Sequence, residues 1–174
     1  MAQAMPQGIF LVDGGHYDRL KSTFATPLDL TLLRNKVLPD HPSARSIYFR
    51  DIRDASEEDR QRGLFGWLRH NRYEIKGRHF NQDADMPRER YGTNLVELAV
   101  EALSISQPGD TVALVASDHK LEPLLRRLLA SGIECILVST LNAPKTIAPS
   151  LSLVDAASRF VDIAEFEMNI AYGT

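Results

Sequence analysis

The stretch Gly8-Ile9-Phe10-Leu11-Val12-Asp13-Gly14-Gly15-His16-Tyr17 is an apolar run that ends in a carboxylate, two glycines and a histidine. Such a run closed by Gly-Gly predicts a short strand buried on both faces, which is typical of a parallel sheet. In open α/β sheets, ligands bind in the crevice beyond the carboxyl ends of the strands. We therefore expect Asp13 to lie where ligands bind, although Asp before Gly-Gly is also typical of a simple turn.

A second apolar run, Val112-Ala113-Leu114-Val115-Ala116, ends in Ser117-Asp118-His119-Lys120. Asp118 can cap the helix predicted after it, and that role is compatible with ligand binding. Two strands that deliver Asp13 and Asp118 to one edge of a sheet would form a compact anionic site. Because carboxylate oxygens suit Mg²⁺ and Mn²⁺, the pair predicts a divalent-cation site.

The 174 residues favour a single domain over residues 1–174, with residues 1–7 disordered. Met1–Gln7 lacks the features of a signal peptide and no apolar run is long enough to span a membrane, so we expect a cytoplasmic protein. The net charge of −3 provides no overall attraction for nucleic acid, although residues 45–90 are mildly positive. Cys135, the one cysteine, lies in an apolar run and is predicted to be a core residue rather than a nucleophile.

Strands and helices are predicted to alternate along the chain, which indicates an α/β fold with a parallel sheet covered by helices on both faces. Tyr17–Thr26 is predicted to be an irregular link. Gly77–Gly92 is predicted to be a polar loop, and loops of this length are often functional. The predicted helices begin at Pro27, Ser56, Asn94, Glu122 and Leu151, and the further predicted strands are Ile47–Phe49, Tyr73–Lys76, Ile133–Val138 and Arg159–Ile163.

The order of these parts resembles the NYN domains, also called LabA-like or DUF88 proteins, of the PIN-like nuclease superfamily. The resemblance covers nearly the whole chain and implies a single-domain Rossmann-like fold. Four segments carry it: Leu11–His16, with His where the family has Asn; Tyr91–Asn94, with Glu101 two turns into the following helix; Ala116–Leu121, followed by paired Leu and Arg residues; and the tail Leu153–Phe160.

The resemblance implies a metal-dependent ribonuclease, in which carboxylates hold a divalent ion that activates water against a phosphodiester. By this resemblance Asp13, Glu101 and Asp118 are expected to be catalytic, to hold Mg²⁺ or Mn²⁺, and to point into one cleft. Asn94, or Leu95 if the register is shifted by one, and Lys120 replace two aspartates of the family, so the ion is expected to bind weakly. The residues expected to contact a single-stranded RNA substrate are His16 and Lys120 at the rim of the cleft, together with Asn94, Arg88 and Arg90.

Several of these residues also have a purely structural interpretation. His16 could be an exposed loop residue, Glu97 could face the site instead of Glu101, and Arg88 and Arg90 could simply solvate their loop. Two functions therefore stay open: a ribonuclease with a partly degraded acidic site, or an inactive module on the same fold that binds RNA, a nucleotide or a protein. The number of carboxylates at the site separates the two, and the sequence also leaves open a homo-oligomer.

Overall fold

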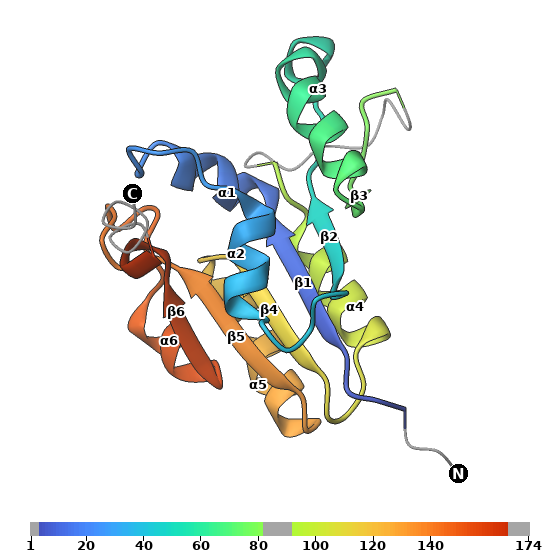
Figure 1. Cartoon of the computed structure of the whole chain (residues 1–174). Helices are drawn as coiled ribbons and strands as arrows, with labels where there is room; N and C mark the ends of the chain where they lie inside the picture. Colours follow the sequence, from blue (N-terminus) through green and yellow to red (C-terminus); the bar gives the residue numbers. More distant parts are fainter. Residues whose placement is uncertain (1–3, 82–91, 167–174) are drawn as a thin grey trace.

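The computed structural model describes residues 4–81 and 92–166, which form a six-stranded parallel sheet with helices on both faces (Figure 1). The predicted α/β class is confirmed. The strands are β1 (Gly8–Asp13), β2 (Arg45–Phe49), β3 (Tyr73–Lys76), β4 (Thr111–Val115), β5 (Glu134–Ser139) and β6 (Arg159–Asp162). The helices are α1 (Gly14–Lys21), α2 (Leu30–Val37), α3 (Ala55–His70), α4 (Leu95–Ile105), η1 (His119–Leu121), α5 (Glu122–Ala130) and α6 (Leu151–Ala156).

The strand β1 lies inside the sheet and is buried on both faces, as its apolar sequence predicted. Successive side chains of a strand point to opposite faces. Ile9 and Leu11 accordingly pack in the hydrophobic core under α4, α5 and α6, whereas Phe10 and Val12 pack in the core under α1 and α2. The same alternation in the neighbouring strands gives the protein one hydrophobic core on each side of the sheet.

The strand order β3-β2-β1-β4-β5-β6 contains a reversal of direction between β1 and β4. From β1 the chain proceeds outward to β2 and β3, and it then returns to place β4 on the other side of β1. In open α/β sheets, ligands bind at such a topological switch point, beyond the carboxyl ends of the strands. Asp13 ends β1, and Asp118 follows β4, whose Val115 is paired with Val12. The topology therefore places both aspartates at the switch point.

The expectation of an irregular link over Tyr17–Thr26 is wrong for its first half, because α1 extends from Gly14 to Lys21, while residues 22–26 are irregular. Asp13 caps this helix by accepting a hydrogen bond of 3.0 Å from the backbone N–H of His16. Gly14 permits the helix to start this close to β2. A Cβ atom on Gly14 would lie 2.5 Å from the carbonyl oxygen of Phe49. Gly14 therefore allows a close approach of backbones rather than a turn.

Smaller differences occur at the chain start and at helix starts. Asp29 caps α2 and Asp54 caps α3, in place of the predicted starts at Pro27 and Ser56. Gln7, expected to be disordered, donates its backbone N–H to Asp110 at 2.8 Å. Within the described residues, no helix has the length and apolar character needed to cross a membrane.

Candidate functional site

A polar pocket of about 140 Å³ lies at the carboxyl ends of β1 and β4. It brings together four residues that the sequence predicted for the site, Asp13, Asn94, Asp118 and Lys120. The other lining residues are Arg19, Thr93, Leu95 and Val96. We refer to this cavity as the aspartate pocket.

Asp13 is fixed in its position by two hydrogen bonds to the same carboxylate oxygen. The Thr93 hydroxyl donates to Oδ1 at 2.6 Å, and the backbone N–H of His16 donates to it at 3.0 Å. Thr93 also accepts the backbone N–H of Gly15 at 2.9 Å. Burial raises the pKa of the Asp13 carboxyl, and these hydrogen bonds offset part of that effect. Both bonds are to Oδ1, and Oδ2 accepts no hydrogen bond from the described residues.

Asp118 lines the same pocket and is more open than Asp13, with 33% of its side chain exposed. It caps η1, because its Oδ1 accepts the backbone N–H of Lys120 at 2.9 Å. The capping role is therefore compatible with a place in the lining of the pocket. Lys120 itself is exposed and lines the same pocket. The Asp13 carboxylate is thus held rigidly, whereas the Asp118 carboxylate is accessible to solvent.

Glu101 does not reach the aspartate pocket. It lies two turns beyond Asn94, which corresponds to about 10.5 Å along the helix axis. There its Oε1 pairs with Lys76 at 3.0 Å and with Arg45 at 3.6 Å. No group of three or more His, Cys, Asp or Glu side chains that could hold a metal ion occurs in residues 4–81 and 92–166. Asp13, Glu101 and Asp118 were expected to converge in one cleft. The structure instead brings Asp13 and Asp118 together without Glu101.

His16 is fully buried, and its expected place at the rim of the cleft is also corrected. Its Nε2 lies 2.9 Å from the Ser139 hydroxyl and its Nδ1 lies 3.1 Å from the Ser117 hydroxyl. Burial, with a contribution from Arg19, lowers the pKa of His16 to about 3, so the imidazole is neutral at physiological pH. His16 therefore ties the carboxyl ends of β1, β4 and β5 together and has no ring nitrogen left for a ligand.

Arg19 is a candidate site residue that the sequence interpretation missed. It lies on α1, in the segment predicted to be an irregular link, and it lines the aspartate pocket. The helical spacing of Tyr17 and Leu20, both buried, was the available signal for this helix. Arg88 and Arg90, which were expected to contact RNA, lie outside the described residues.

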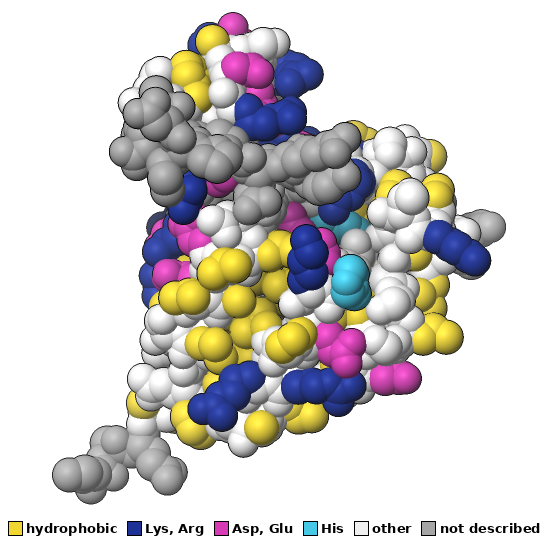
Figure 2. All heavy atoms as spheres, turned by 180° about the vertical axis from the view of Figure 1, so that it is seen from behind, with side chains coloured by type: hydrophobic (Ala, Val, Ile, Leu, Met, Phe, Trp, Pro, Cys, Tyr) yellow, Lys and Arg dark blue, Asp and Glu magenta, His cyan; other side chains and the backbone are white. Residues whose placement is uncertain are grey.

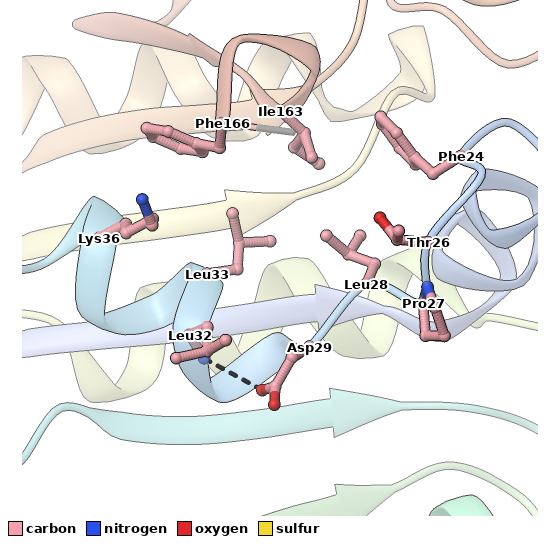
Figure 3. A pocket seen from close by; sticks show the side chains of 10 residues that line it. All are labelled: Phe24, Thr26, Pro27, Leu28, Asp29, Leu32, Leu33, Lys36, Ile163 and Phe166. Carbon is pink, nitrogen blue, oxygen red and sulfur yellow. Dashed lines mark hydrogen bonds between the residues drawn. The ribbon is translucent and has the colours of Figure 1, made fainter. Parts of the chain in front are cut away.

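A separate apolar cavity of about 150 Å³ lies between α2 and residues 163–166 (Figure 3). Its walls are mostly hydrophobic side chains, with Asp29 and Lys36 among the few charged ones. Asp29 caps α2 by accepting the backbone N–H of Leu32 at 3.0 Å, the bond drawn in Figure 3. The cavity shares no lining residue with the aspartate pocket and presents no second carboxylate, so it is not the predicted ion site.

The face covered by α4, α5 and α6 carries many exposed hydrophobic side chains (Figure 2). On α4 these are Val96, Val100 and Leu103. Val96 also lines the aspartate pocket, together with Leu95. The start of α4 is therefore the apolar wall of the pocket, and the charged groups come from the end of β1, from α1 and from the segment that follows β4.

A family model for the NYN domain matches residues 11–164, a range that includes every residue of the aspartate pocket. A crystal structure of a protein of unknown function from Vibrio parahaemolyticus is similar to this chain, with a TM-score of 0.70 and 18% sequence identity. The match covers 94% of this chain and 96% of that chain. At this identity the similarity shows the fold alone. No curated protein matches the chain.

Proposed function

This chain belongs to the NYN domain family of the PIN-like superfamily, and we propose that it is a divalent-metal-dependent ribonuclease with a reduced acidic site, acting on single-stranded RNA. The observation that carries the proposal is that Asp13 and Asp118 line one pocket at the switch point of a parallel sheet. The family supplies the nuclease fold. The two carboxylates supply the chemistry by which such a fold hydrolyses a phosphodiester.

The residues present fit a weakly held ion. Mg²⁺ is commonly bound through one or two carboxylates, with waters and substrate phosphates completing its octahedron. Asp13 and Asp118 would hold the ion, which would polarise the phosphodiester and lower the pKa of a water molecule. Lys120 lines the same pocket and its positive charge opposes cation binding, so the affinity of the free protein for the ion is expected to be low.

The side chains around the two aspartates have separate tasks. Thr93 and the His16 backbone N–H hold Asp13 in one orientation, which reduces the reorganisation needed on binding. Lys120 and Arg19 place positive charge where the phosphate would lie, and cations stabilise the charge that develops on a phosphoryl group. The Asn94 side chain accepts the backbone N–H groups of Val96 and Glu97, so its role is to begin α4 beside the pocket.

Incubation of the purified protein with labelled single-stranded RNA and Mn²⁺ tests the proposal. We expect slow cleavage that requires Mn²⁺ or Mg²⁺ and is lost in Asp13→Asn and Asp118→Asn variants that remain folded by circular dichroism. Asp155→Asn is the matched control, because Asp155 is exposed on α6 and lies outside the pocket. Equal cleavage by all three variants would reject the assignment of the site.

A second candidate function is a non-catalytic module that binds RNA. The specific observation in its favour is the cationic lining of the pocket by Arg19 and Lys120, combined with the placement of Glu101 elsewhere. The same assay separates the two candidates. No cleavage of several RNA sequences in Mn²⁺, with RNA binding retained in Asp13→Asn, would favour the binding module.

A further inference from the structure

A second polar pocket adjoins the aspartate pocket. The two cavities share Arg19 and Asp118 in their walls, and the second is larger, with a volume of about 440 Å³. Its remaining walls come from the end of β4 and from the link between β5 and α6, which contributes Lys145, Thr146 and Ser150. A ligand that reaches Asp118 from the aspartate pocket can therefore continue into this second pocket.

The walls of the second pocket present donors suited to an anion. Arg19 and Lys145 supply positive charge, and Ser117, Thr146 and Ser150 supply hydroxyl groups. Hydrogen bonds from charged donors to phosphate oxygens are about twice as strong as neutral ones. Asp118 is the one acidic residue in this wall, so the pocket is locally cationic although the chain carries a net charge of −3.

Of the two cations of this pocket, Arg19 is compensated only at longer range, by Asp13, whose pKa its charge lowers. Within the described residues, neither Arg19 nor Lys145 forms an ion pair with a carboxylate, in contrast to Arg50, which pairs with both Asp18 and Glu57. In the part of the chain that the structure describes, the Nε atom of Arg19 is buried without a hydrogen-bond partner, as is that of Arg50, whose guanidinium group nevertheless has two carboxylate partners. A buried donor left unpaired is costly and usually marks a function or a missing partner. For the Nε–H of Arg19, the missing partner is a hydrogen-bond acceptor.

Lys145 and Thr146 lie on a turn that the fold holds in place. The backbone N–H groups of Ile147 and Ala148 both donate to the carbonyl oxygen of Pro144, at 2.8 and 2.9 Å. The Ile147 side chain packs against the core under α1 and α2. The turn is therefore anchored at its base while Lys145 and Thr146 remain exposed at the pocket. Such a support limits the entropy lost when a ligand is bound.

We propose that this second pocket binds a phosphate group of the RNA strand through Arg19 and Lys145, next to the phosphate that lies at Asp13 and Asp118. This inference rests on the proposed function, because the shared wall at Asp118 places the two phosphates on one strand. The bound group is either an internal phosphodiester or a terminal 5′-monophosphate, which offer the same anionic oxygens to these donors.

The test is the affinity of a short single-stranded RNA, carrying either a 5′-phosphate or a 5′-hydroxyl, measured by fluorescence anisotropy in EDTA. Without a divalent ion there is no cleavage, so the measurement is independent of the nuclease activity. The test variants are Lys145→Met, which changes an exposed side chain, and the double variant Arg19→Met with Lys145→Met. The matched control is Arg127→Met with Lys36→Met, which removes the same charge from exposed positions on α5 and α2.

We expect the double variant to lose about tenfold or more in affinity, since charged hydrogen bonds to one phosphate are removed. The slope of log K against log salt should become shallower by about 0.7, the value for one phosphate on a single strand. Lys145→Met should show a smaller loss of affinity and a smaller change of the salt slope than the double variant. The control should keep the affinity and the slope of the unmodified protein.

The two RNAs distinguish the two sources of phosphate. Preferential binding of the 5′-phosphorylated RNA, lost in the double variant, would assign the pocket to a terminal monophosphate. Equal binding of both RNAs, reduced equally in the double variant, would assign it to an internal phosphodiester. Unchanged affinity in Lys145→Met and in the folded double variant, or an equal loss in the control, would overturn the proposal. Retained Mn²⁺-dependent cleavage in that case would leave the proposed nuclease function standing.

Discussion

Two of the buried carboxylates, Glu57 and Asp13, lie in regions that differ in how the carboxylate charge is compensated. Beside β2, Glu57 is 1% exposed and contacts the guanidinium groups of Arg50 and Arg53. At the end of β1, Asp13 is 3% exposed and contacts a hydroxyl and a backbone N–H instead. Burial of a charge without an opposite charge is costly. The first region uses its carboxylate for stability, and the second carries a cost that a bound ligand would relieve.

The pKa shifts of the two carboxylates have opposite signs for the same reason. At Glu57 burial alone would raise the pKa, but the Arg53 backbone N–H and the two guanidinium groups outweigh it and hold the pKa below 4.5. At Asp13 burial prevails over its hydrogen bonds, and the pKa is raised above 3.8. A carboxylate in a pocket whose pKa is raised by burial is a candidate functional group, whereas the lowered pKa of Glu57 reflects its ion pairs with arginine.

The largest expected effect is the loss of the cation that compensates Glu57. Arg50→Met leaves a buried carboxylate with Arg53 as its remaining cation, and breaking a buried ion pair in this way costs about 3 kcal/mol or more. Urea unfolding followed by circular dichroism measures the free energy of unfolding. The control is Arg62→Met, also at an ion pair involving α3, where both partners are largely exposed and the cost is expected to be below about 1 kcal/mol. Equal losses in the two variants would remove the distinction between the regions.

The next effect concerns His16, the buried histidine whose backbone N–H donates to Asp13. Its pKa is about 3 in the folded protein and about 6.5 when unfolded, so the unfolded chain binds a proton that the folded chain does not. The contribution of His16 to the free energy of unfolding is therefore fully present above pH 6.5 and is lost progressively as the pH drops toward 3. Protonation of His16 in the unfolded chain should by itself lower the free energy of unfolding by about 2 kcal/mol at pH 5, compared with its value at neutral pH.

Urea unfolding at pH 7 and at pH 5 measures this contribution. His16→Asn should be less stable at pH 7 but should show a smaller loss on acidification. His119→Asn, at an exposed histidine, should keep the loss of the unmodified protein. An unchanged pH dependence in His16→Asn would mean that His16 is not buried between its two serines.

The sequence predicted the strands and the edge at which Asp13 and Asp118 meet, because apolar runs and strand ends are local features. It failed at α1, since Gly14-Gly15 is also typical of a turn and the close contact with Phe49 that requires Gly14 comes from another strand. It failed at Glu101 because the spacing along a helix does not show how far the helix carries a residue from the pocket. Arg19 was missed together with its helix.

A smaller effect is expected from the cation that lines the aspartate pocket. Lys120→Asp changes the local charge by two units beside Asp13 and Asp118, and we expect Mn²⁺ to bind about tenfold more tightly, equivalent to about 1.4 kcal/mol. Titration calorimetry with Mn²⁺ measures this. Lys36→Asp, at the apolar cavity, is the control and should have no effect. Unchanged affinity in Lys120→Asp would show that its side chain points away from the aspartates.

The smallest effect is expected where the sequence and the structure disagree most directly. Glu101 pairs with Lys76 and Arg45 on partly exposed positions, so Glu101→Gln should lower the free energy of unfolding by at most about 1 kcal/mol. Because these pairs lie away from the aspartate pocket, the Mn²⁺ affinity and the Mn²⁺ dependence of RNA cleavage should equal those of the unmodified protein. Asp118→Asn, measured in parallel, should weaken Mn²⁺ binding. If Glu101→Gln lost as much Mn²⁺ binding as Asp118→Asn, Glu101 would be a ligand of the ion. In that case α4 would have to move when the ion binds.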